Sequence, residues 1–228
     1  MSIISTKNIF KTYSNGKVQV NALNGVSVNI EQGEFTAIVG PSGSGKTTLL
    51  NVIGGLDQAT SGSVNIDGTE ITQLNDNALI DFRLKNIGFV FQAYNLIPVL
   101  TAKENVEFIM LLQNRDKKER DKRSSSLLKA VGLEEQTNKR PNEMSGGQQQ
   151  RVAVARALAS KPRFVLADEP TANLDSQSTT NLLDIMARLN KEEDITFVFS
   201  THDQRVIDRA RRVITLEDGK TISDETRD

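Results

Sequence analysis

Short apolar runs broken by turn residues dominate the first 40 positions of the chain. Four of these runs are rich in β-branched and aromatic side chains and predict strands, over residues 3–10, 18–23, 26–30 and 35–39. The pairs Asn15-Gly16, Asn24-Gly25 and Gln32-Gly33 separate them, and glycine next to asparagine favours tight turns. The chain therefore begins with several short strands joined by turns.

Helical and strand signals then alternate. Residues 46–53 predict a helix that ends at Gly54-Gly55. Residues 63–66 predict a strand that runs into Asp67-Gly68, a pair typical of hairpin turns. Residues 87–91 predict another apolar strand.

The spacing of apolar residues becomes helical between residues 101 and about 140. Val106 and Met110 share one face of a first helix, and Leu127 and Val131 mark the end of a second. The run of mixed charges at residues 115–123 is typical of a solvated helix face.

After Arg151 the pattern alternates again. We expect helices over 152–159, 176–190 and 203–210 and strands over 163–167, 195–199 and 213–216. Alternation of this kind predicts an α/β fold with a parallel sheet, here carrying a helical insertion.

Composition narrows the possible classes of function. The 228 residues include 28 Lys and Arg against 29 Asp and Glu, so the basic surface typical of nucleic-acid binding is not expected. There is no cysteine, which excludes disulfides and thiolate metal sites. The N-terminal residues do not resemble a signal peptide, and the apolar runs are too short to cross a bilayer. We therefore expect a cytoplasmic protein with no nucleic-acid partner, which acts at a membrane only through another protein.

A phosphate-binding loop is the clearest chemical motif. The pattern G-x-x-x-x-G-K-T follows an apolar strand and precedes a helix, which is the context such a loop requires. Its backbone amides can surround phosphate oxygens, Lys46 can place a positive charge beside them, and the Thr47 hydroxyl can bind Mg²⁺. The nucleotide-binding candidates here are Gly40, Pro41, Ser42, Gly43, Ser44, Gly45, Lys46, Thr47 and Thr48.

Two adjacent acids end the apolar strand at residues 163–167. Asp168 is predicted to lie at the carboxyl edge of the sheet, where ligands bind in open parallel sheets, and to hold Mg²⁺ directly or through water. Glu169 is placed to polarise a water for attack on a γ-phosphate.

Two other polar residues follow predicted strands. His202, the only histidine, comes after the strand at 195–199 and is a candidate for contacting the γ-phosphate. Gln92 follows the strand at 87–91, and its amide oxygen could bind Mg²⁺ or orient the water; on its own, an exposed loop glutamine is the simpler interpretation.

A second anion site is predicted at residues 145–148. Ser145 can cap a helix whose first residues, Gly146 and Gly147, leave the backbone amides uncovered, and Gln148 follows them. Tyr13 lies in what the pattern indicates is a turn region. It is either an aromatic platform for adenine or a partly exposed packing residue.

Taken together, these motifs resemble the ATP-binding cassette (ABC) ATPases over essentially the whole chain. The resemblance makes residues 40–48 the Walker A loop, Gln92 the Q-loop glutamine, Tyr13 the adenine-stacking aromatic, and Ser145 to Gln148 the signature. Asp168 and Glu169 correspond to the Walker B aspartate and catalytic glutamate, Asp175 to the D-loop, and His202 to the switch histidine. Met144 stands where leucine is more usual, a volume-conserving exchange.

The resemblance implies a P-loop NTPase fold with a RecA-like core, an N-terminal antiparallel β subdomain and an inserted helical subdomain. The β and RecA-like parts would span residues 1–92 and 151–228, and the helical part 93–150. It implies ATP and Mg²⁺ as ligands, with Thr47, Gln92 and Asp168 at the metal. Glu169, His202 and Lys46 would be catalytic.

The resemblance further implies a homodimer, in which each signature covers the γ-phosphate on the other chain while Asp175 communicates across the interface. An integral membrane permease would contact the helical insertion, with Leu96, Ile97, Val99 and Leu100 as candidates, although packing in the helical core is the simpler expectation for most of them. The protein would then lie on the cytoplasmic face of the inner (plasma) membrane. Segments such as Gly54-Gly55-Leu56-Asp57 and residues 95–98 resemble the subgroup typified by LolD and the ATPase region of MacB.

Two other functions are considered. A soluble ABC-type ATPase acting on DNA or ribosomes would carry a long coiled-coil insertion or a second cassette, and this chain has neither. A cassette like FtsE, which signals across the membrane without moving a solute, cannot be separated from a transporter on the sequence of this subunit alone.

Overall fold

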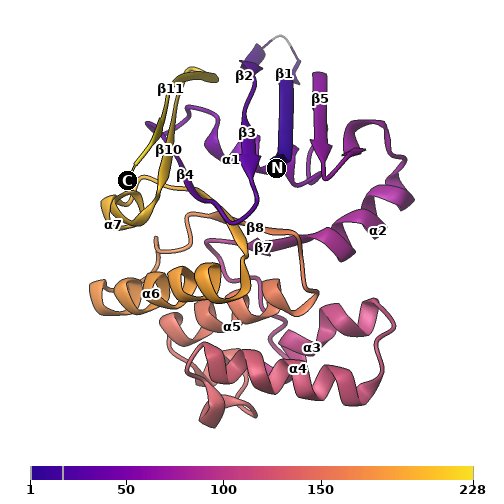
Figure 1. Cartoon of the computed structure of the whole chain (residues 1–228), viewed down its shortest axis with the longest axis vertical. Helices are drawn as coiled ribbons and strands as arrows, with labels where there is room; N and C mark the ends of the chain where they lie inside the picture. The colour runs from indigo at the N-terminus through magenta and orange to yellow at the C-terminus, as the bar shows by residue number, and fades with distance from the viewer. Residues whose placement is uncertain (1, 17, 228) are drawn as a thin grey trace.

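The computed structural model describes residues 2–16 and 18–227, which form two sheets and a group of helices (Figure 1). The strands are β1 (Ser2–Asn15), β2 (Val18–Val26), β3 (Asn29–Glu31), β4 (Phe35–Val39), β5 (Ser61–Ile66), β6 (Thr69–Glu70), β7 (Ile87–Val90), β8 (Phe164–Asp168), β9 (Thr196–Ser200), β10 (Arg212–Glu217) and β11 (Lys220–Thr226). The α-helices are α1 (Lys46–Ile53), α2 (Asp76–Asn86), α3 (Ala102–Leu112), α4 (Lys117–Ala130), α5 (Gly146–Ala159), α6 (Ser176–Glu193) and α7 (Gln204–Arg209). Short 3₁₀ turns occur at Ile71–Gln73, Glu134–Gln136 and Pro141–Glu143.

The N-terminal sheet is antiparallel. Its strand order is β2-β1-β5-β6, with β3 also paired to β1. The predicted turn at Asp67-Gly68 is confirmed, because it joins β5 to β6 with both residues at positive φ. An antiparallel β subdomain therefore precedes and flanks the α/β core, as expected.

The second sheet carries the candidate site. Its order is β11-β10-β4-β9-β8-β7, and all neighbouring pairs are parallel except β10 with β11. The carboxyl ends of β4, β9, β8 and β7 lie side by side at one edge of this sheet. The segments that follow these four strands are therefore brought together, although they are far apart in sequence.

The parallel sheet is buried on both faces, which explains why its strands are continuously apolar rather than alternating. Val165 and Phe199 pack with helices α3, α4, α5 and α6, whereas Leu166 and Val198 pack with α1 and the antiparallel sheet. Phe35 lies in the first of these clusters, with its ring centroid 4.6 Å from that of Phe199. Figure 1 shows the four helices gathered on the side of the parallel sheet away from β1, β2 and β5.

The predicted elements of the core are confirmed, but three differences are clear. The strand predicted at 26–30 is divided, since β2 ends at Val26 and β3 begins at Asn29. Helix α2 was not predicted, because none of its residues is buried and its apolar side chains follow no helical stripe. Strand β11 was also missed: it is an edge strand, mostly exposed and polar.

Helix α5 runs through the boundary predicted at residues 150 and 151, and its buried residues share one core cluster with α3, α4 and strand β8. The division into subdomains at that position stays a prediction. Among the described residues, no helix has the length and apolar character needed to span a membrane.

Candidate active site

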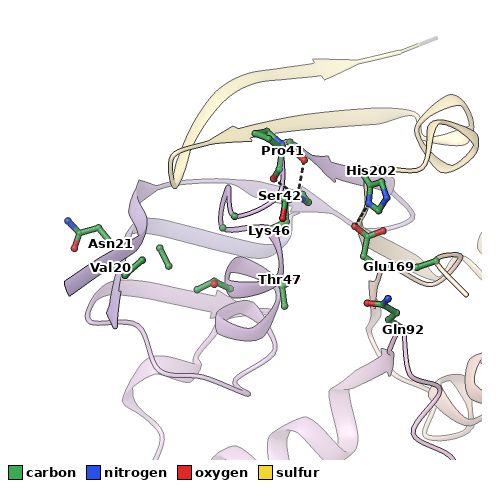
Figure 2. Close-up of a pocket in the computed structure, with 15 residues that line it drawn as sticks. Val20, Asn21, Pro41, Ser42, Lys46, Thr47, Gln92, Glu169 and His202 are labelled. Carbon is green, nitrogen blue, oxygen red and sulfur yellow. Dashed lines mark hydrogen bonds and ion pairs between the residues drawn. The ribbon is translucent and has the colours of Figure 1, made fainter. Parts of the chain in front are cut away.

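An open pocket of about 540 Å³ lies at the carboxyl edge of the parallel sheet (Figure 2). It is lined by residues 20–22, 40–43 and 45–48, together with Gln92, Glu169, Ala172 and His202. Figure 2 shows Val20 and Asn21 at one end of the pocket, Glu169, His202 and Gln92 at the other, and the loop at residues 40–46 between them. Ser44, which belongs to the same loop and was also predicted to bind nucleotide, is buried and is not among the lining residues.

The glycines of the loop are required by its backbone path. Gly40 and Gly45 have φ values of +148° and +101°, which side chains of L-residues rarely tolerate. A Cβ on Gly40 would lie 2.0 Å from the carbonyl oxygen of Leu216, and one on Gly45 would lie 2.4 Å from that of Ala22. Both clashes are with backbone, so no side-chain movement relieves them.

Lys46 begins helix α1 and is 8 % exposed. Its ammonium donates hydrogen bonds of 2.8 Å to the carbonyl oxygens of Gly40 and Pro41, on the loop itself. The positive charge is therefore held over the loop, in the wall of the pocket.

Thr47 and Asp168 come together from α1 and the end of β8. The Thr47 hydroxyl donates to Asp168 Oδ1 at 2.9 Å. Thr47 and Gln92 line the pocket, and Asp168 reaches it through Thr47 rather than as a lining residue. Hydroxyl, carboxylate and amide oxygens are the ligands that Mg²⁺ prefers, usually with one or two carboxylates and with phosphates completing its shell. Within residues 2–16 and 18–227, no cluster of three or more His, Cys, Asp or Glu side chains could hold a metal by itself. The donor set fits a metal bound together with a polyphosphate.

Glu169 follows β8 in a left-handed conformation, with φ at +44°. Its amide donates to the carbonyl of Ser200 at 2.8 Å, which fixes it against the end of β9. Its carboxylate lies between the His202 Nδ1 atom, 2.7 Å from Oε1, and the Thr201 hydroxyl, which donates to Oε2 at 3.3 Å. Glu169 and His202, predicted from separate motifs, thus meet in one pocket.

A network next to this pair was not identified from the sequence. The Asp203 carboxylate accepts hydrogen bonds from Nε and Nη2 of Arg205, at 2.9 and 2.7 Å, and from the buried Thr171 hydroxyl at 2.8 Å. Arg205 first, and then Thr171, lower the pKa of Asp203 to about 2. This network joins the segment after His202 to the segment after Glu169. The only sequence signal is an aspartate at the start of a helix.

The predicted cap at Ser145 is confirmed. Its hydroxyl accepts from the Gln148 amide, and the Gln148 side-chain oxygen in turn accepts from the Ser145 amide, so α5 begins with a complete capping box. A Cβ on Gly146 would lie 2.8 Å from Tyr94 Oη, and one on Gly147 would lie 2.8 Å from Ser178 Oγ. None of residues 145–148, all of them described, is among those lining the pocket. The structure does not bring this helix start to the phosphate loop of its own chain.

Asp175 caps helix α6. It accepts from the amide and the hydroxyl of Ser178, at 2.8 and 2.7 Å, and these hydrogen bonds lower the pKa of Asp175. Ser178 is the neighbour of Gly147, so the beginnings of α5 and α6 pack together.

The placement of Tyr13 in a turn region was wrong, because the residue lies within β1 and pairs with Val20 on β2. The hairpin continues past it, and the polar residues around it hid the strand. Tyr13 is 42 % exposed and is not itself among the pocket-lining residues, whereas its partner Val20 is. Val20, Asn21 and Ala22 were not predicted as site residues, since only strand pairing brings them beside the loop.

Comparison with known proteins agrees with this geometry. The family model for the ABC transporter matches residues 23–172. An uncharacterized ABC transporter ATP-binding protein of Methanocaldococcus jannaschii, MJ0796, is 48 % identical over 227 residues, covering 98 % of this chain and 97 % of that protein. The macrolide export ATP-binding/permease protein MacB of Mannheimia succiniciproducens is 46 % identical over 224 residues, which cover 98 % of this chain but 35 % of that protein.

Two solved structures are similar to this chain over almost its whole length. The dimeric structure of a post-hydrolysis state of the ATP-binding cassette MJ0796, bound to ADP and Pi, matches with a TM-score of 0.90 and 46 % identity over 98 % of both chains. A second dimeric structure of MJ0796 gives a TM-score of 0.91 with 47 % identity, again over 98 % of both chains. The chain therefore belongs to the ABC transporter family, as one of its ATP-binding, ATP-hydrolysing subunits.

Proposed function

We propose that this subunit works as a homodimer that binds ATP and Mg²⁺ in two shared sites and drives a separate membrane permease. One observation carries the proposal. A single pocket gathers the phosphate loop, Gln92, Glu169 and His202, while the anion-binding helix start at Ser145 lies outside it. Each chain therefore carries both halves of a site, the catalytic residues and the signature, but the two halves do not meet within one chain.

Within one site, each residue has a distinct proposed role. Lys46 places its charge beside the β- and γ-phosphates, and Glu169 takes a proton from the water that attacks the γ-phosphorus. His202 holds the γ-phosphate, and its 2.7 Å contact with Glu169 keeps the two groups on the same side of the pocket. Thr47, Asp168 and Gln92 would hold Mg²⁺, which would neutralise phosphate charge.

The homodimer follows from the position of the signature. Ser145 caps α5 with its own hydroxyl, and the following glycines leave backbone amides free for an anion. MJ0796 is dimeric in two solved structures, one of them bound to ADP and Pi, which supports the homodimer. We infer that the anion at this helix start is a phosphate bound to the other chain. Asp175, at the start of α6, is proposed to lie at the same interface.

The permease is proposed to dock in an apolar groove of about 590 Å³ between α2 and the helical insertion. Its lining includes Ile80 of α2, which is 53 % exposed, Ile109 of α3, and the rings of Phe89 and Phe91. Of the candidates named from the sequence, Ile97 lines this groove. Leu96 instead packs against the main core cluster, and Val99 is 71 % exposed.

Several finer assignments belong to the same proposal. A permease partner would place the protein on the cytoplasmic face of the inner membrane. Membership of the subgroup typified by LolD and MacB favours export of a lipoprotein, peptide or drug. The MacB relatives, named for macrolide export, support transport over the FtsE-like signalling alternative. The near balance of acidic and basic residues supports the absence of a nucleic-acid partner.

The central test is Glu169→Gln. We expect turnover to be lost while ATP is still bound, so that ATP converts the protein into a stable dimer in size-exclusion chromatography. Glu134→Gln, at an exposed carboxylate, is the matched control and should hydrolyse ATP normally. A Glu169→Gln variant that stays monomeric in ATP, or that hydrolyses it, contradicts the proposal. For the wild-type protein, activity per subunit should also rise with protein concentration.

The docking groove needs its own test. Ile80→Asp should lower the fraction of protein that sediments with membranes from the native cell, because a charge in the groove must be desolvated on docking. ATP hydrolysis by the isolated subunit should not change. Unaltered sedimentation of the variant would contradict the groove as the permease site.

A further inference from the structure

Three donors converge on Asp57, in the loop after α1. The Tyr13 hydroxyl donates to Oδ2 at 2.6 Å, and both the Lys11 ammonium, at 2.6 Å, and the Gln58 amide, at 2.7 Å, donate to Oδ1. Burial would raise the pKa of Asp57, but the bonds from Lys11 and Tyr13 outweigh it and leave the pKa below its usual value. Asp57 is therefore a fixed, charged acceptor for the end of the Tyr13 ring.

Lys11 constrains the same ring from one side. Its ammonium lies 4.7 Å from the centroid of Tyr13, within the range of a cation–π contact. The ammonium is itself held by Asp57 and by the carbonyl of Gln58, at 2.8 Å, and the side chain is only 12 % exposed. The Tyr13 ring is thus clamped at its hydroxyl and covered on one face.

The clamped ring stands at the rim of the nucleotide pocket. Tyr13 pairs across the hairpin with Val20, and its hydroxyl also interacts with the side chain of Thr48; both of these residues line the pocket. Val20 marks the end of the pocket opposite Glu169 and His202 (Figure 2). A nucleoside triphosphate with its γ-phosphate near Glu169 would place its base toward this rim.

We propose that Asp57, together with Lys11, is a positioning residue that holds the Tyr13 ring as a one-sided platform for the base of ATP. The inference rests on the proposed role of Tyr13 in stacking. An exposed tyrosine without the clamp would have to be ordered when the base binds. Immobilising such a side chain weakens binding by about 2- to 10-fold.

The test compares ATP with inorganic tripolyphosphate, which has the phosphates but no base. Asp57→Ala should weaken ATP binding about 2- to 10-fold in calorimetry. The inhibition constant of tripolyphosphate against ATP hydrolysis should not change. Asp76→Ala removes an exposed aspartate from α2 and is the control for loss of charge. Equal losses for both ligands would show a merely structural role for Asp57 and overturn the inference.

A double-mutant comparison separates positioning from direct contact. In a Tyr13→Ala background, Asp57→Ala should have no further effect on ATP affinity, because the ring that it positions is gone. Additive losses would overturn the inference. Tyr13→Phe keeps the ring and removes only the hydroxyl that bonds Asp57, so it tests the positioning of the ring even if Asp57→Ala does not fold. Full ATP affinity in Tyr13→Phe would also overturn the inference.

The outcome for Tyr13→Ala identifies which statement fails. If Tyr13→Ala leaves ATP affinity unchanged, the stacking role is wrong and the inference falls with it. If Tyr13→Ala weakens ATP while Asp57→Ala and Tyr13→Phe do not, the stacking role stands and only the positioning by Asp57 is refuted.

Discussion

Gln150 connects helix α5 to two loops of the candidate active site, and we predict a measurable effect of its replacement by leucine. The side chain is fully buried on α5. Its Nε2 donates to the carbonyl of Pro170 at 2.6 Å, in the loop after Glu169, and to that of Phe91 at 3.4 Å, just before Gln92. Gln150→Leu keeps the shape and removes both hydrogen bonds.

The expected loss of stability in Gln150→Leu follows from these contacts. Leaving the buried Pro170 oxygen without its donor costs about 1–3 kcal/mol. Oε1 of Gln150 has no hydrogen-bond partner among the described residues, so its loss removes a buried unpaired acceptor and offsets part of that cost. We therefore expect the free energy of unfolding to fall by about 1–2 kcal/mol, or about 2–8 °C in Tm for a chain of this size.

Urea unfolding and steady-state kinetics test the prediction together. Because the Pro170 loop carries Glu169 at its start, we expect kcat to fall more than ATP affinity. Gln149→Leu is the control, since Gln149 is only partly buried and bonds the carbonyl of Met144 on its own segment. If Gln150→Leu changes neither unfolding nor kcat, the contact with Pro170 does not couple helix α5 to the loop that begins at Glu169.

Three further changes test other parts of the site. Gly45→Ala should abolish ATP binding in calorimetry, because its Cβ would meet the Ala22 carbonyl at 2.4 Å in a backbone with φ of +101°; retained binding would refute that loop geometry. Ser145→Ala should lower the free energy of unfolding by about 1 kcal/mol through loss of the cap, and should weaken ATP-dependent dimerisation, as measured by sedimentation. Asp203→Asn should lower the free energy of unfolding by about 1–2 kcal/mol at pH 7. This is less than the full pKa shift of Asp203 implies, because the Arg205 side chain is 39 % exposed and solvent screens the ion pair. The pKa of Asp203 is lowered from 3.8 to about 2, so this stabilisation is complete above about pH 4 and is lost as the pH falls through 2. The difference between wild type and Asp203→Asn in urea unfolding should therefore be smaller at pH 3 than at pH 7, and a larger difference at pH 3 would contradict the assignment.

Local signals were sufficient wherever the chemistry is contiguous in sequence. The phosphate loop between β4 and α1 and the cap at Ser145 each depend on residues within one turn of chain, so the sequence alone predicted both. The apolar runs of β8 and β9 predicted buried parallel strands for the same reason. Where the local signal was weak, as in α2 and β11, the elements were missed, because exposed polar positions carry little periodicity.

The sequence by itself therefore determined the fold class, the phosphate loop and the residue types available for catalysis. The tertiary structure decided which of them meet. The strands lie in the order β4-β9-β8-β7 rather than in chain order, and this places Glu169 against His202 and Thr47 against Asp168. Strand pairing likewise placed Tyr13 in a strand beside Val20, and tertiary packing brought its hydroxyl within hydrogen-bond distance of Asp57, 44 residues away. Such contacts depend on the order of strands and the packing of loops, which no local pattern of hydrophobic residues encodes.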